Sequence, residues 1–154
     1  MKRICFLMLL CLSIVSCKKI TDVSPLELCI EVFDEKGNNL MDPSFDGNWA
    51  ITGFTVDYLG ESYNVKITPV KTYLPTFYGV EIRDYRSYDI GKWIVYFGEL
   101  DGDSKQNATL VFHWPDASID RVTIDYNKRS TSIKLNGKNV DILNKRWNSF
   151  RIIK

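Results

Sequence analysis

The chain is predicted to fold as an all-β protein, an antiparallel β-sandwich of about 8 to 10 strands. Three observations support this class. Apolar and polar residues alternate in many short segments, turn residues separate those segments at nearly even spacing, and no long window shows the apolar stripe of a helix. A barrel is the alternative, because strand spacing alone does not separate one closed sheet from two packed ones.

The composition is that of a single globular domain, since 45% of the 154 residues are hydrophobic and 25% are charged. The formal charge of +1 comes without a long basic run, so nucleic acid is not expected as a partner. His113 is the only histidine, which excludes a His-rich zinc centre and a metalloprotease helix.

The beginning of the chain has the pattern of a secretory signal peptide. A basic start at residues 1–3 precedes an apolar run at 4–15, which is shorter than the roughly 20 residues that span a bilayer. Ile14-Val15-Ser16-Cys17 then resembles the bacterial lipobox, whose cysteine is acylated and becomes the new N-terminus. We therefore expect residues 1–16 to be removed and Cys17 to carry a diacylglyceryl group with acyl chains such as palmitate, which anchor the protein to a membrane.

Cys29 is the one cysteine that is expected to be neither removed with the signal peptide nor lipidated. Of the four cysteines, Cys5 and Cys11 depart with the signal peptide and Cys17 is lipidated, so an intramolecular disulfide is not expected. Cys29 lies between Leu28 and Ile30 in an apolar strand, which favours a buried, inert thiol over intermolecular pairing. Loss of residues 1–16 also changes the formal charge from +1 to −1, because Lys2 and Arg3 are lost.

The rest of the chain is predicted to be a lipidated N-terminus and tether at 17–25 and a single sandwich domain, immunoglobulin-like or related, at 26–154. Turns are expected at 34–39 and 59–62, and Asn136-Gly137 is the strongest hairpin signal. The apolar run 93–97 indicates a central strand. The expected strands are 26–32, 54–58, 63–67, 78–82, 93–97, 110–114, 122–126, 132–135, 140–143 and 150–152.

Several motifs occur in an order that is similar to that of a known group. They are the lipobox, residues 30–43 with Asp34, Gly37, Asn38-Asn39-Leu40 and Asp42-Pro43, residues 112–125, Leu135-Asn136-Gly137-Lys138, and Ile152-Ile153-Lys154. In this order they resemble the small lipoproteins of Bacteroides and related bacteria. The resemblance implies a β-rich domain in a bacterial cell envelope and carries no catalytic residue.

One turn departs from the pattern of those lipoproteins. They often have Trp-Gly-Asp-Gly followed by an Asp, whereas this chain has Trp114-Pro115-Asp116-Ala117-Ser118 and then Asp120. Both glycines are therefore replaced, which changes the turn geometry expected there.

No catalytic motif is found, and we do not expect an enzyme. Ser-His-Asp chemistry would need His113, but there is no Gly-x-Ser-x-Gly motif, and the alternation of the strand turns His113 away from Phe112 and Trp114. His113 is thus interpreted as a surface or cross-strand residue. A glycoside hydrolase needs only two carboxylates, and 19 acidic residues supply too many pairs for this to discriminate.

Two groups of side chains are candidates for ligand binding. Asp101, Asp103 and Asn107 offer oxygen ligands for calcium, but their spacing does not follow the EF-hand pattern, so a plain hairpin loop is favoured and no other cofactor or metal is expected. Tyr73, Tyr85 and Tyr88 lie in the irregular segment 69–90, where exposed aromatic rings would bind a sugar or a protein.

The functional hypothesis is a lipid-anchored, non-catalytic envelope protein that binds a glycan or a protein partner. The alternatives are a pilus-like assembly subunit, which would pair an exposed edge strand with another chain, and a small glycoside hydrolase. Lys18 is not the acidic residue of an inner-membrane retention signal, which favours the outer membrane. Lys18-Lys19-Ile20 is not an acid-rich surface-export stretch, so the periplasmic or surface face stays open.

Overall fold

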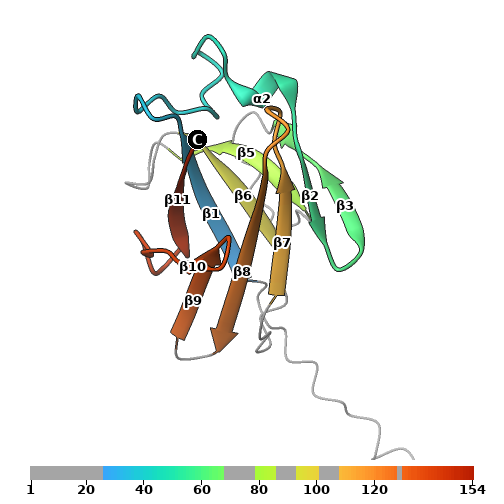
Figure 1. Ribbon diagram of the computed structural model, residues 1–154, viewed down its shortest axis with the longest axis vertical. Helices are drawn as coiled ribbons and strands as arrows, with labels where there is room; N and C mark the ends of the chain where they lie inside the picture. The colour runs from blue at the N-terminus through green and yellow to red at the C-terminus, as the bar shows by residue number, and fades with distance from the viewer. Residues whose placement is uncertain (1–25, 68–78, 86–92, 101–107, 128–129) are drawn as a thin grey trace, which may run out of the picture.

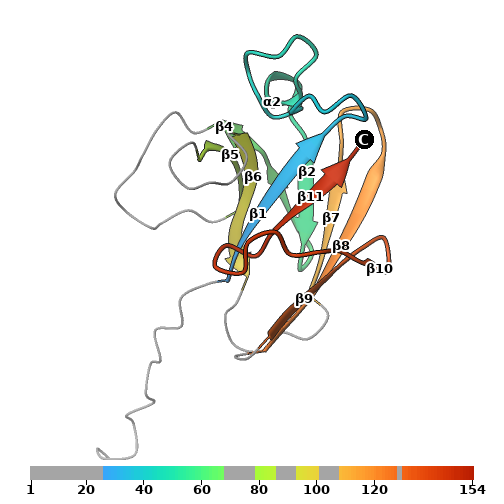
Figure 2. The ribbon, with the colours of Figure 1, turned by 90° about the vertical axis from the view of Figure 1, so that its left-hand side faces the viewer.

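The strands of the protein form two sheets that pack face to face (Figures 1 and 2). In the computed structural model, one sheet, called sheet A here, has five strands and the other, sheet B, has six. This arrangement confirms the predicted all-β sandwich. The described residues are 26–67, 79–85, 93–100, 108–127 and 130–154.

The described part of the chain holds eleven strands and one helical turn, α2 (Trp49–Thr52). Sheet A consists, in spatial order, of β11 (Ser149–Ile153), β1 (Leu26–Phe33), β6 (Trp93–Leu100), β5 (Val80–Asp84) and β4 (Lys66–Ile67). Sheet B consists of β10 (Lys138–Asn139), β9 (Ser130–Leu135), β8 (Ile119–Asn127), β7 (Ala108–His113), β2 (Thr55–Tyr58) and β3 (Glu61–Asn64). Neighbours in sheet B are antiparallel throughout.

Sheet A is mixed, because β1 pairs parallel with β11 and β4 pairs parallel with β5. β6 pairs antiparallel with both β1 and β5 and is the third of the five strands. The central strand predicted from the apolar run at 93–97 is therefore confirmed. Central strands are covered on both sides, so they bear apolar residues at every position.

Two predicted strands differ from the structure. The prediction of a strand at 140–143 is wrong. Only Lys138–Asn139 form a strand beside β9, and after a last backbone hydrogen bond from Val140 to Ile133 the chain leaves sheet B. A turn that Asn144 fixes, by accepting the backbone N–H of Arg146 at 2.9 Å, directs the chain toward β11. The predicted strand 63–67 is split at Val65, so that β3 lies in sheet B and β4 in sheet A.

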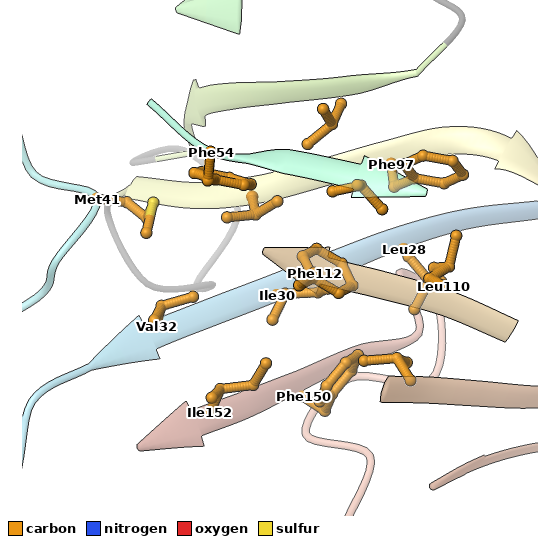
Figure 3. Close-up of a cluster of buried hydrophobic side chains, with 14 of the residues drawn as sticks. Leu28, Ile30, Val32, Met41, Phe54, Phe97, Leu110, Phe112, Phe150 and Ile152 are labelled. Atoms are coloured by element: carbon orange, nitrogen blue, oxygen red, sulfur yellow. The ribbon is translucent and has the colours of Figure 1, made fainter. Parts of the chain in front are cut away.

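The core lies between the inner faces of the two sheets (Figure 3). Sheet A contributes alternate residues of β1, which are Leu28, Ile30 and Val32, and sheet B contributes residues such as Leu110 and Phe112. All five are fully buried. Burial of each such side chain contributes about 1.5–3 kcal/mol, so the period-two pattern of the sequence supplies much of the stability of the fold.

The hairpin between β9 and β10 is the one predicted from Asn136-Gly137. Both residues have positive φ, 50° and 81°, as a type I′ turn requires. Leu59-Gly60, between β2 and β3, has φ values of 52° and 83°, so the predicted turn at 59–62 is confined to two residues. These tight turns keep successive strands of sheet B adjacent.

Asp120, the second residue of β8, joins the two sheets through a buried polar network. Its Oδ2 accepts the indole N–H of Trp114 at 2.8 Å and lies 2.5 Å from Nζ of Lys154, while Oδ1 accepts from Asn136 at 2.7 Å. Burial alone would raise the pKa of Asp120, but these three donors together outweigh it and hold the pKa below its usual value. Because Lys154 also donates its backbone N–H to Phe33 in β1, the network connects both sheets.

Ala117 occupies a conformation that favours glycine in the turn between β7 and β8. Its φ is 64°, and its backbone N–H donates to the Trp114 carbonyl at 3.0 Å. Asp116 stabilises the turn by accepting the backbone N–H of Ser118 at 2.9 Å. The left-handed region costs a residue with a Cβ atom about 1–2 kcal/mol, so this turn stores strain.

Ala117→Gly is expected to raise the free energy of unfolding by about 1 kcal/mol. Relief of the left-handed strain exceeds the added entropy of glycine in the unfolded chain, which opposes it by about 0.4–1 kcal/mol. Urea denaturation measures the change. Ala108→Gly, in the extended backbone of β7, is the control and should lower the same free energy by about 0.5–1 kcal/mol. Destabilisation by both variants would contradict the strain at Ala117.

Candidate functional site

A long loop with a fixed conformation covers one end of the sandwich. It runs from Asp34 to Phe54 between β1 and β2, and it lies at the end toward which β1 points, opposite Leu26 (Figure 2). Loops longer than about 12–15 residues are uncommon in small domains and are usually functional. We call this end of the molecule the apical end. The long loop makes it a candidate for a ligand-binding or catalytic site.

Side-chain hydrogen bonds to the backbone fix the first half of the loop. Asp34 Oδ1 accepts the backbone N–H groups of Lys36 and Asn38 at 2.9 and 2.7 Å. Asn39 donates to the Trp93 carbonyl at 2.8 Å, which ties the loop to β6. Such side-chain contacts satisfy backbone N–H groups that have no hydrogen-bond partner in a neighbouring strand.

The second half of the loop rests on an aromatic platform. The ring centroid of Trp49, in α2, lies 5.6 Å from that of Trp114, and the ring of Phe54 lies 4.8 Å from Trp114. Asn48 caps α2 by accepting the backbone N–H of Ile51 at 3.2 Å. Trp49 is half-buried and Ile51 is 75% exposed, so the turn presents apolar surface outward.

A shallow groove of about 380 Å³ opens where α2 leads into β2. Gly53, with a φ of 79°, lets the chain change direction there, and a Cβ atom at this position would lie 3.7 Å from the Val65 side chain. Small-molecule sites are typically about 300–1,000 Å³, so the groove is within that range. Its lining residues are Thr52, Gly53, Phe54, Thr55, Asn64 and Val65.

Polar side chains from three strands of sheet B continue from this groove. Thr55 of β2 pairs in register with Asn64 of β3 and with His113 of β7, and one step further along the same face Asp57 pairs with Ser62. Side chains two residues apart on a strand share a face, so these five form one outward-facing surface, which we call the polar array.

His113 and Asp57 are joined by a hydrogen bond within the polar array. Nε2 of His113 lies 2.7 Å from Oδ2 of Asp57, and the two side chains are 42% and 45% exposed. Hydrogen bonds from Ser62 and then from His113 lower the pKa of Asp57, so its carboxylate is ionised at neutral pH. His113 is thus a cross-strand surface residue, as its strand phase predicted.

The order of these groups does not match that of a catalytic triad. In a Ser-His-Asp triad the histidine lies between serine and aspartate and takes the serine proton. Here Asp57 lies between Ser62 and His113, so His113 is not placed to activate Ser62. The arrangement leaves hydrogen-bonding groups on an exposed surface and does not place a general base beside Ser62.

Of the residues predicted to bind ligands, Tyr85 is the one that lies within the described ranges. Tyr85 follows β5 of sheet A and is 9% exposed, with its ring 6.1 Å from the Trp147 ring in an edge-on contact. It is on the other sheet from the groove, so the structure does not bring it to the polar array. The other predicted site residues, outside the described ranges, are Cys17, Tyr73, Tyr88, Asp101, Asp103 and Asn107.

The apical loop and the groove were missed from the sequence. The predicted turn covered only 34–39, whereas the loop continues to Phe54 and includes the helical turn α2. The available signal was the density of Asp, Asn, Ser, Pro and Gly from residue 34 to residue 48. The polar array had no linear signal, because its members come from three strands and only the sheet register brings them together.

Cys29 lies in a small second cluster on the outer face of sheet A. Cys29 and Ile94 are fully buried there, and Tyr96 and Tyr85, which belong to the same cluster, are 6% and 9% exposed. Burial, with a smaller contribution from the negative charge of Glu27, raises the pKa of the Cys29 thiol to about 12. The predicted burial of this thiol is confirmed, and little thiolate is present at neutral pH.

Cys29 is expected to be unreactive in the folded protein. A soluble form that begins at residue 17 and carries Cys17→Ser has Cys29 as its single cysteine. Iodoacetamide at pH 8 should leave its mass unchanged for hours and should add one carbamidomethyl group within minutes in 6 M guanidinium. Rapid labelling without denaturant would contradict the burial and the raised pKa.

The described residues contain no group of three or more His, Cys, Asp and Glu side chains that could hold a metal ion. Within the same ranges, no helix has the length and apolar character needed to cross a membrane. Comparisons with protein-family models, curated proteins and solved structures find no match to the chain. What the groove can bind is therefore inferred from the chemistry of its own residues.

Proposed function

We propose that this protein is a non-catalytic, lipid-anchored module of a bacterial cell envelope that binds a glycan in the apical groove. The observation that carries the proposal is the junction of the groove with the polar array of Thr55, Asp57, Ser62, Asn64 and His113. A concave surface beside convergent polar groups, set on the strands of a sheet, is the usual form of a small-ligand site.

The chemistry of the array suits sugar hydroxyls. A hydroxyl both donates and accepts hydrogen bonds, and the array offers both functions through the Thr55 hydroxyl and the Asn64 amide, with the Asp57 carboxylate as a further acceptor. A stable protein interface usually buries about 800 Å² on each partner around a less polar centre. The groove, with six lining residues, is smaller than such an interface, which favours the glycan.

The lipid anchor and the groove would lie at opposite ends of the molecule. Acylation of Cys17 would leave the nine residues 17–25 as a tether, which reaches at most about 30 Å. β1 then leads from Leu26 toward the apical end (Figure 2). The groove would thus face away from the membrane, where a glycan can approach. Residue 18 is a lysine and not the acidic residue of an inner-membrane retention signal, which supports the outer membrane as the location.

A protein partner is the second candidate, supported by exposed apolar residues. Ile51 is 75% exposed at the apical end, and Ile119, in register with His113, is 54% exposed. Pilus-like assembly is less favoured, because three edge strands are short. Among the edge strands of the described residues, β4 and β10 have two residues each, β3 has four and β11 has five, so short edges predominate.

The soluble Cys17→Ser form should bind one or more members of a panel of maltohexaose, cellohexaose, mannohexaose and N-acetylchitohexaose. Asn64→Ala, which removes an amide from the groove, should weaken that binding up to about tenfold, as expected for the loss of one hydrogen bond. Isothermal titration calorimetry measures the affinity.

Ser132→Ala is the matched control, because Ser132 is exposed on β9 of the same sheet and far from the groove. It should leave the affinity unchanged, and thermal melts should show that both variants fold. A silent panel would overturn the glycan proposal and favour a protein partner. Equal weakening by both variants would show that binding does not occur in the groove.

A further inference from the structure

We infer that Asp57 makes the apical groove selective for neutral over anionic glycans. The inference rests on the proposed function, since it names the class of glycan that the same site takes. Asp57 lies two residues beyond Thr55, a lining residue of the groove, and on the same face of β2. Two residues of a strand span about 7 Å, so the carboxylate stands at the margin of the groove.

The hydrogen bonds around Asp57 keep its charge in place. The Ser62 hydroxyl and Nε2 of His113 both bond to the carboxylate, the latter at 2.7 Å, and together they favour the ionised form. Register positions Ser62 opposite Asp57 on β3 and His113 opposite Thr55 on β7. The carboxylate is therefore supported from both neighbouring strands and remains 45% exposed toward a ligand.

The Asp57 carboxylate offers hydrogen-bond acceptors to a ligand. A carboxylate accepts through both of its oxygens. The carboxylate therefore matches the O–H donors of a neutral sugar, whereas its negative charge opposes a carboxylate or sulfate on an acidic sugar.

The first described cation in the same row is too far away to offset the charge. Asp57 pairs in register with Val111, and Val111 with Arg121, so Arg121 stands two strands from Asp57. Two strand spacings are about 10 Å, which exceeds the screening length of about 8 Å at physiological ionic strength. An anionic sugar in the groove would thus be repelled by Asp57 more than it is attracted by Arg121.

The test compares each oligosaccharide of the hexaose panel that binds with the same oligosaccharide after oxidation of its 6-hydroxyl groups to carboxylates. A like charge about 4 Å away in water weakens binding about fivefold, so the neutral form should bind at least that much more tightly. Asp57→Asn, which keeps the size of the side chain and removes its charge, should reduce this ratio about fivefold.

Asp125→Asn is the matched control, since Asp125 is also exposed on the outer face of sheet B but lies on β8, far from the groove. It should leave the ratio unchanged. A second measurement uses the unaltered protein. Raising the salt from 0.01 to 1 M shortens the screening length from about 30 Å to about 3 Å and should also reduce the ratio.

The outcomes separate the two claims. If no member of the panel binds, the proposed function and this inference are both wrong. If neutral and oxidised glycans bind equally, or if Asp125→Asn changes the ratio as much as Asp57→Asn does, the selectivity is wrong and the glycan site stands. A ratio that is insensitive to salt would likewise overturn the electrostatic selectivity.

Discussion

The indole of Trp114 lies where three parts of the molecule meet. Its ring stacks on Phe112 of β7 with centroids 5.1 Å apart, and it supports Trp49 of the apical loop. Its N–H donates to Asp120, which also binds Lys154 from the end of sheet A. Aromatic contacts contribute about 0.5–1.5 kcal/mol beyond their burial, and a buried carboxylate is costly without its donors. Trp114 is therefore the side chain that links the second half of the apical loop to both sheets.

The groove inherits its shape from that fixed end. Trp49 belongs to α2, and α2 leads through Gly53 into β2, so the position of the short helix decides how the groove wall meets the strands. The polar array needs no such support, because the register of β2 with β3 and β7 already places Thr55 and Asp57 beside their partners. A site of this kind combines a rigid sheet, which gives precision, with a loop, which gives concavity.

The sequence predicted the sandwich and most of its strands, because half-buried strands show their burial directly as alternation, as in Leu28, Ile30 and Val32. It also predicted the turn at Asn136-Gly137, whose positive φ values limit the choice of residues. It did not predict the split at Val65, since a strand that changes sheets keeps the same alternation. Nor did it predict the site, because Asn64 and His113 are 49 positions apart and meet only through Thr55.

Hydrogen exchange with peptide-level mass spectrometry on Trp114→Phe tests most directly whether Trp114 holds the apical end. This variant keeps an aromatic ring on the platform and removes the donor to Asp120. Exchange follows local opening, so peptides that cover residues 40–55 should exchange faster, while peptides of β1 and β6 keep their protection. Unchanged exchange in residues 40–55, or equal acceleration across both sheets, would contradict the account.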